Sequence, residues 1–149
     1  TLTISAFIAG MIAGRAVMSL RSMSRLDPIL VIRAGLVLTF AAVLVLWVSG
    51  TYELSAVAMA VAGFGVGILY PPAASMALAA APGVPTAASS RLVLAAGLAV
   101  LVAPLLLGVV ADLAGISVAW LLIPAACVGA VLLSTRVARA ARERAGAAT

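Results

Sequence analysis

Long apolar runs alternate with short polar gaps along the whole chain. Five runs stand out, at about residues 1–20, 29–49, 54–79, 92–110 and 118–137. A bilayer core of about 30 Å takes roughly 20 helical residues, so each run is long enough to cross a membrane. Backbone groups in lipid must find hydrogen-bond partners within their own segment, which makes each run a predicted helix. The pattern therefore predicts an all-α integral membrane protein with five transmembrane helices.

The gaps have the composition of turns, with Gly, Pro, Ser and Asp in most of them. The last residues, 139–149, are small or polar, and we expect them to form a cytoplasmic tail that is frayed at its end. Residues 1–138 would then form one transmembrane domain. The chain begins with Thr, and the number of predicted spans is odd, so we expect it to be a piece of a longer protein. A natural five-helix protein is the alternative.

Arginines occupy alternate gaps, and the gaps between them carry only the carboxylates Glu53 and Asp112. Short arginine-rich loops stay on the cytoplasmic side of a membrane. The pattern therefore places the N-terminus outside and the C-terminus in the cytoplasm. The arginines are Arg15, Arg21, Arg25 and Arg33 around the first gap, Arg91 in the third gap, and Arg136, Arg139, Arg142 and Arg144 after the last run.

The composition agrees with this class. Hydrophobic residues make up 66% of the chain and charged residues 9%, against roughly 45–50% and about 25% in soluble domains. A net charge of +5 raises the question of nucleic acid, but topology and anionic lipid account for arginines at helix ends. We expect the lipid bilayer as a partner and no nucleic acid. The expected location is the bacterial inner (plasma) membrane.

Few side chains could support catalysis or hold a metal ion. The chain has no histidine and no lysine, and Cys127 is its single cysteine. Cys127 lies inside the last apolar run, where we interpret it as a packing residue. No nucleophile has a base at helical spacing. The sequence therefore predicts no enzyme, no metal site and no cofactor.

Glycines and prolines punctuate the predicted helices. Gly10 and Gly14 are four residues apart, as are Gly63 and Gly67 with Gly65 between them, and such spacing lets helix backbones approach closely. Prolines within helices remove a backbone hydrogen bond and clash with the preceding turn, so we expect bends or loosened turns there. Such prolines favour a protein whose helices flex or line a solute route, although static bundles contain them too. The internal prolines are Pro71, Pro72, Pro104 and Pro124.

Three segments carry a resemblance to a known family. Gly10-Met-Ile-Ala-Gly-Arg15, followed by Arg21 and Arg25, looks like a loop motif in which glycine precedes an acidic residue and basic residues. Gly63-Phe-Gly-Val-Gly-Ile-Leu-Tyr-Pro71 is similar to a glycine-rich helix that faces a substrate cavity. The stretch from Gly97 through Pro104 and Gly108 to Asp112-Leu-Ala-Gly115 resembles a helix with a mid-membrane proline. Together they resemble helices eight to twelve of the major facilitator superfamily of secondary transporters.

The resemblance implies that the chain is one part of a larger transporter. Family members have twelve helices in two halves that rock about a central site, which opens to each side of the membrane in turn. It also implies that the loop formed by Gly10, Gly14, Arg15, Arg21 and Arg25 acts as a conformational latch at the cytoplasmic face. Gly14 stands where the family has an acidic residue. Anchoring of Arg15 among lipid headgroups therefore remains an equal alternative.

Few polar groups could meet a substrate within the membrane. The candidates are Thr39, Tyr70 and Ser75, together with the backbone freed at Pro71. We favour Tyr70, because an aromatic hydroxyl beside a proline can stack on a ligand and hydrogen-bond to it. A packing or interfacial tyrosine is the alternative. Gly63, Gly65, Gly67, Pro104, Gly108 and Pro124 are expected to bend or pack helices.

The predicted function is secondary active transport of a small organic solute by alternating access. None of the five runs has an ionisable residue near its centre, so we expect any coupling carboxylate in the missing N-terminal half of the protein. The sparse polar groups permit an apolar drug-like solute or a neutral sugar-like one. The alternative is a membrane scaffold that does not transport, with its glycine faces binding other helices.

Overall fold

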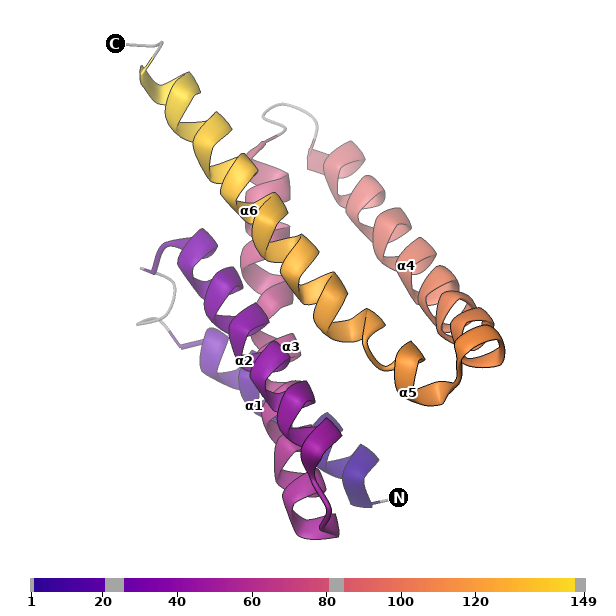
Figure 1. Ribbon diagram of the computed structural model, residues 1–149. Helices are drawn as coiled ribbons and strands as arrows, with labels where there is room; N and C mark the ends of the chain where they lie inside the picture. Colours follow the sequence, from indigo (N-terminus) through magenta and orange to yellow (C-terminus); the bar gives the residue numbers. More distant parts are fainter. Residues whose placement is uncertain (1, 21–25, 81–84, 147–149) are drawn as a thin grey trace.

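The computed structural model is a bundle of α-helices, described for residues 2–20, 26–80 and 85–146 (Figure 1). Within these ranges there is no strand, which confirms the predicted all-α class. The elements in order are α1 (Leu2–Met18), α2 (Pro28–Val48), α3 (Tyr52–Ala79), α4 (Pro85–Ala114), α5 (Ile116–Ala119) and α6 (Leu122–Gly146).

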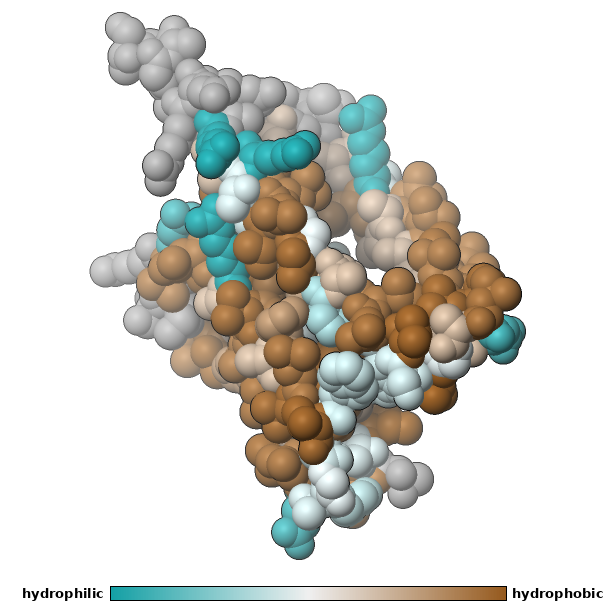
Figure 2. Space-filling model, in the orientation of Figure 1, coloured by the Kyte–Doolittle hydropathy of each residue, from teal (hydrophilic) through white to brown (hydrophobic). Residues whose placement is uncertain are grey.

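Four helical segments of the described chain are long and apolar enough to cross a membrane. Their length and composition are compatible with an integral membrane location, and Figure 2 shows hydrophobic residues over most of the visible face. The predicted run 1–20 is the exception, because α1 has 17 residues and spans about 26 Å at 1.5 Å per residue. The four segments are Pro28–Val48, Tyr52–Ala79, Thr86–Ala114 and Ile116–Arg139.

Two helices are longer than the apolar runs that predict them. α4 begins at Pro85, ahead of the predicted start at 92, because proline suits the first turn of a helix. The Ser89 and Ser90 hydroxyls both donate to the Thr86 carbonyl, each at 2.9 Å, so their polar groups are satisfied within that helix. α6 continues to Gly146. The stretch 139–146 of the predicted tail is thus helical, since Ala and Arg favour helix, and the end expected to be frayed, 147–149, lies outside the described residues.

The predicted helix at 118–137 is broken at Trp120–Leu121, between α5 and α6. Pro124 explains the break, because it has no N–H to offer the Trp120 carbonyl four residues earlier. The Ile123 N–H donates to that carbonyl instead, at 3.3 Å, and the Ala125 N–H bonds to Leu121 at 3.1 Å. Pro124 therefore lies in the first turn of α6, where proline is tolerated, rather than inside a continuous helix.

The turn between α4 and α5 depends on Gly115, whose φ of 90° lies in the left-handed region that side chains avoid. Its N–H donates to the Ala111 carbonyl at 3.0 Å and ends α4. Its own carbonyl accepts from Val118 at 3.1 Å and starts α5. The start of α2 is equally well defined: Asp27 accepts a hydrogen bond from the Ile29 N–H at 2.9 Å, and Pro28 occupies the first turn.

α3 is the central helix, with α1 on one side and α2 on the other. Gly10 of α1 lies against the Ala60 backbone of α3, and Gly14 lies against Phe64 and Gly67. A Cβ at Gly14 would come within 2.6 Å of the Phe64 carbonyl oxygen. The two helices run parallel and meet backbone to backbone at these glycines. We call this contact the α1–α3 seam.

The opposite side of α3 meets α2 in the same way. A Cβ at Gly35 would lie 2.9 Å from the Gly65 carbonyl oxygen, and a Cβ at Gly65 would lie 2.9 Å from the Gly35 carbonyl oxygen. Two residues along a helix rotate the side chain by about 200°, which is why Gly65 faces away from Gly63 and Gly67. We call this contact the α2–α3 seam. The three glycines of one short segment thus serve two partners.

α6 packs along α2 in the antiparallel direction, with Cys127 buried, while α4 stands apart. No described residue of α4 is buried. Figure 1 shows α4 to one side of the other long helices. Pro104 and Gly108 both lie on this uncovered helix, which stays helical through the proline. The bundle therefore has a tight part, formed by α1, α2, α3 and α6, and one open helix.

Alanine at Gly10 is expected to separate α1 from α3 and to lower the free energy of unfolding by about 1–3 kcal/mol, as other overpacking substitutions do. Alanine at Gly97 of α4 is the control, because the described residues leave its Cβ unobstructed. Gly97→Ala should leave stability unchanged or raise it by about 0.5–1 kcal/mol. Reversible unfolding of both variants in mixed detergent micelles measures the difference; equal stabilities would contradict the seam.

Candidate functional site

One end of the bundle gathers arginines from several helices. Arg15 lies in the last turn of α1 and Arg33 in the second turn of α2. Arg91 lies in the second turn of α4, which starts where α3 ends. Because α1 and α3 are parallel and α2 is antiparallel to both, these side chains share one end, which we call the arginine end. Glu53 in the first turn of α3 and Asp112 in the last turn of α4 lie toward the opposite end.

Arg15 and Tyr70 come together across the end of the α1–α3 seam. The Arg15 guanidinium carbon lies over the Tyr70 ring, 6.0 Å from its centroid. A cation at this distance is attracted to the ring face by about 0.5–1 kcal/mol at an exposed site, and by about 2 kcal/mol where water is excluded. Tyr70 is 49% exposed, so the weaker value applies. The predicted latch residue and the predicted substrate residue are therefore partners.

The turn after Tyr70 lines a cavity of about 220 Å³ at the arginine end. Pro71 and Pro72 have no N–H, so the carbonyls one turn earlier, at Gly67 and Ile68, lose their helical partners. Ser75 lines the same cavity, but its hydroxyl donates to the Pro72 carbonyl at 2.9 Å. The cavity wall is otherwise apolar and comes from α1, α2 and the residues before α2. The lining residues are Met18, Leu26, Pro28, Val31, Pro71, Pro72 and Ser75.

Thr39 does not belong to this group. It is 6% exposed, and its hydroxyl donates to the Gly35 carbonyl of its own helix at 2.9 Å. The hydroxyl packs against Gly65 within the α2–α3 seam. Of the four predicted substrate residues, Pro71 and Ser75 thus line the cavity, whereas Tyr70 contacts Arg15 instead and Thr39 lies apart from all three. Of the predicted latch, Arg21 and Arg25 lie outside the described residues.

A polar contact that the sequence did not predict joins α2 to α6. The Arg33 Nε donates to the Ser134 hydroxyl at 3.2 Å, and that hydroxyl donates to the Val131 carbonyl at 2.7 Å. Arg33 is about 8 Å along α2 from its start and half-buried. The sequence feature that could have indicated this contact is the position of Arg33 inside the apolar run 29–49 rather than in the gap before it. This contact fixes α6 against α2 at the arginine end.

The described residues offer little for metal or cofactor chemistry, because they contain no group of three or more His, Cys, Asp or Glu side chains that could hold a metal ion. The arrangement at the arginine end suits reversible contact instead. The Arg15 guanidinium, the Tyr70 ring and the two prolines after it lie where the glycine-lined faces of α1 and α3 end.

Comparison with protein-family models, with curated proteins and with solved structures finds no match in any of the three.

A double-mutant cycle is expected to detect the contact between Arg15 and Tyr70. Arg15→Gln and Tyr70→Leu each remove the cation–π attraction, so the double variant should lose less stability than the sum of the two. We expect a coupling free energy of about 0.5–1 kcal/mol. Tyr70→Phe keeps the ring face and should keep the coupling. Unfolding in mixed micelles provides the four free energies, and strictly additive losses would show that the two side chains do not interact.

Proposed function

We propose that this chain is the C-terminal part of a secondary transporter of the major facilitator type, which moves a small organic solute by alternating access. The helices of the chain would be the eighth to the twelfth of twelve. In this proposal the arginine end faces the cytoplasm of a bacterial cell, and the C-terminus lies there too. The proposal is supported by the helical architecture, by the glycine seams and above all by one contact.

That contact is the pairing of Arg15 with Tyr70 at 6.0 Å. It joins α1 to α3 at the end of a seam where glycines replace interlocking side chains. A seam without interlocking side chains offers little resistance to sliding or rocking. A cation–π contact of about 0.5–1 kcal/mol can then hold one position, and its loss is small beside the few kcal/mol that separate conformational states. These are the properties of a latch.

In the proposed cycle, Arg15 lies on Tyr70 when the cytoplasmic ends of α1 and α3 are together. Movement of α1 along α3 releases the guanidinium, which then meets water or lipid headgroups. Pro71 and Pro72 give this end of α3 a backbone that lacks two helical hydrogen bonds and deforms more easily. The adjoining cavity with Ser75 changes shape in the same step. Opening and closing of the cytoplasmic side would thus be coupled to one contact.

The uncovered helix α4 is consistent with this assignment. None of its described residues is buried, and exposed leucines and valines lie all along it, including Leu94, Leu101 and Leu105. In a twelve-helix protein, one face of such a helix would meet the N-terminal half and the other would meet lipid. The coupling carboxylate would belong to that N-terminal half. The apolar lining favours an uncharged solute, either drug-like or sugar-like.

A membrane scaffold that does not transport is the second candidate. The glycine seams favour it to the extent that they make tight, static packing. The seams are already filled by contacts within the chain, however, since Gly10, Gly14, Gly63 and Gly67 all face each other's helices. They are therefore not free to bind other proteins. α4 would remain as an assembly surface, together with the exposed apolar faces of the other described helices.

Charge reversal at Arg15 is expected to reduce transport more than abundance. Arg15→Glu places a carboxylate over the electron-rich ring face and should lower the initial rate per molecule about two- to fivefold, whereas Arg15→Lys should retain most of it. Arg91→Glu makes the same charge change at the same end of the bundle and is the matched control. Nile red and a radiolabelled methyl glucoside serve as probes in proteoliposomes of the full-length protein.

The same experiment can reject the proposal. Flux that matches protein-free liposomes for both probes, under a proton and under a sodium gradient, would contradict transport of either proposed solute class. Equal losses for Arg15→Glu and Arg91→Glu would contradict the latch and leave a topological role for Arg15.

The gene upstream of the codon for Thr1 separates the two candidates. A facilitator-type transporter requires about seven further hydrophobic segments in the same reading frame, with a glycine-rich and arginine-rich loop that repeats the one around Arg15. DNA sequencing of about 700 bases in the 5′ direction is sufficient at roughly 20 residues a span. A start codon directly before Thr1 would contradict the twelve-helix assignment.

A further inference from the structure

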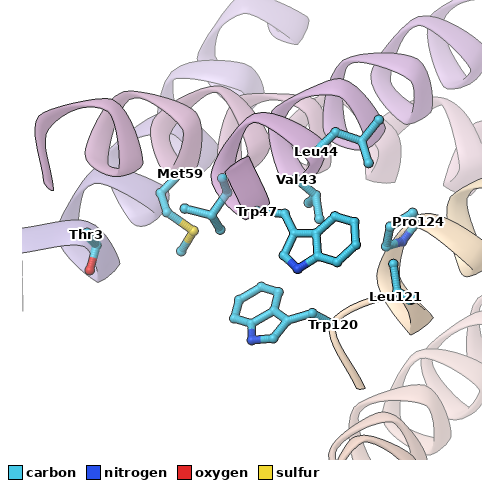
Figure 3. A pocket seen from close by; sticks show the side chains of 9 residues that line it. Thr3, Val43, Leu44, Trp47, Met59, Trp120, Leu121 and Pro124 are labelled. Atoms are coloured by element: carbon cyan, nitrogen blue, oxygen red, sulfur yellow. The ribbon is translucent and has the colours of Figure 1, made fainter. Parts of the chain in front are cut away.

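Both tryptophans of the chain line one cavity at the end opposite the arginines. Trp47 comes from the last turn of α2 and Trp120 from the break between α5 and α6. The cavity has a volume of about 320 Å³, which falls in the range of small-molecule sites, about 300–1,000 Å³. Figure 3 shows the two indole rings beside each other, with Met59 and Thr3 on one side and Pro124 on the other.

The chain builds this cavity in a specific way. α2 and α6 run antiparallel, and their contact is fixed at the arginine end by the hydrogen bond from Arg33 to Ser134. At the far end Pro124 breaks the helix, so that Trp120 lies in a turn and its ring is not held in the helical register. The next residue, Leu121, also lines the cavity. The proline therefore opens a space where a straight helix would have packed against α2.

The lining selects for one chemistry. Among the described residues that line it, Thr3 is the only polar side chain apart from the two indole N–H groups, and none is charged. Indole faces prefer flat partners in offset or edge-to-face geometry. Trp47 is 57% exposed and Trp120 is 38% exposed, so neither indole is enclosed by protein contacts. A saturated hydrocarbon chain would pack against the aliphatic residues but could not stack on the two indole rings.

We propose that this cavity, which we call the two-tryptophan site, binds an uncharged, flat aromatic molecule. The ligand lies between the α2 tryptophan and the α5–α6 tryptophan, with its edges against Met59, Leu121 and Pro124. This site is distinct from the cavity beside Tyr70 and does not depend on the proposed transport activity. A lipophilic aromatic compound would reach it from the apolar phase that surrounds the bundle.

Fluorescence provides a direct test, because Trp47 and Trp120 are the only tryptophans of the chain. Anthracene is the probe, since it accepts excitation from indole. The chain is reconstituted in phosphatidylcholine nanodiscs and anthracene is titrated in. We expect sensitised anthracene emission that saturates, above the linear signal that lipid partitioning produces. Phenanthrene, which is flat, should displace the probe, whereas the puckered, saturated perhydroanthracene should not.

Paired variants test the role of each ring. Trp120→Phe and Trp120→Leu both leave Trp47 as the sole reporter and differ only in the aromatic face. Trp120→Leu should bind anthracene about five- to tenfold more weakly than Trp120→Phe. Trp47→Phe and Trp47→Leu repeat the comparison with Trp120 reporting, should one pair fold poorly. Phe40→Leu removes a ring from a different cavity of α2 and α6 and should not change the affinity.

Several outcomes would overturn the proposal. Emission that rises linearly and equals that from lipid partitioning would mean that no site exists. Displacement by perhydroanthracene as readily as by phenanthrene would mean a general apolar cavity. Quenching of both tryptophans by phosphatidylcholine with brominated acyl chains, unrelieved by phenanthrene, would identify a lipid chain as the occupant. Failure of these tests would leave the transport proposal untouched, because that proposal depends on Arg15 and Tyr70.

Discussion

Direct backbone contact along α3 is the constraint on which the rest of the bundle depends. Helices in an apolar solvent gain little from burying apolar side chains, so close approach and dispersion contacts have to hold them together. Gly63 and Gly67 allow this toward α1, and Gly65 allows it toward α2. Glycine has no side-chain freedom to lose in the contact. Its Cα–H groups can also approach carbonyl oxygens across the seam, each worth about 0.5–1 kcal/mol.

The two seams divide the molecule into regions of different character. Buried positions in the tight part are mostly small, such as Ala58, Ala62 and Ala42. Two polar contacts between helices lie at the arginine end, with Arg15 on Tyr70 and Arg33 on Ser134. Two of the cavities lie where proline interrupts regular packing, one beside Pro71 and one beside Pro124. Direct backbone contact thus lies along the middle of the bundle, and irregular backbone lies toward both of its ends.

Periodicity and length predicted the helices well, because an apolar run in lipid has few alternatives. The close approach of Gly10 and Gly14 to α3 was also predictable from spacing. The break at Trp120 was not, because it depends on which residue loses its partner to Pro124, and the apolar run continues unchanged across it. The pairing of Trp47 with Trp120 could not be predicted either, since it requires the register of α2 against α6. Arg33 was assigned to a gap because charge outweighed its position in the run.

The α1–α3 seam joins segments that are not neighbours in the chain: Phe7 meets Gly63 and Met11 meets Gly67, with all of α2 between them. During synthesis α1 therefore emerges long before the surface that fits it. The packing of α1 therefore has to wait for α3. A truncation that ends after α2 would thus leave the glycine face of α1 without the surface against which it packs.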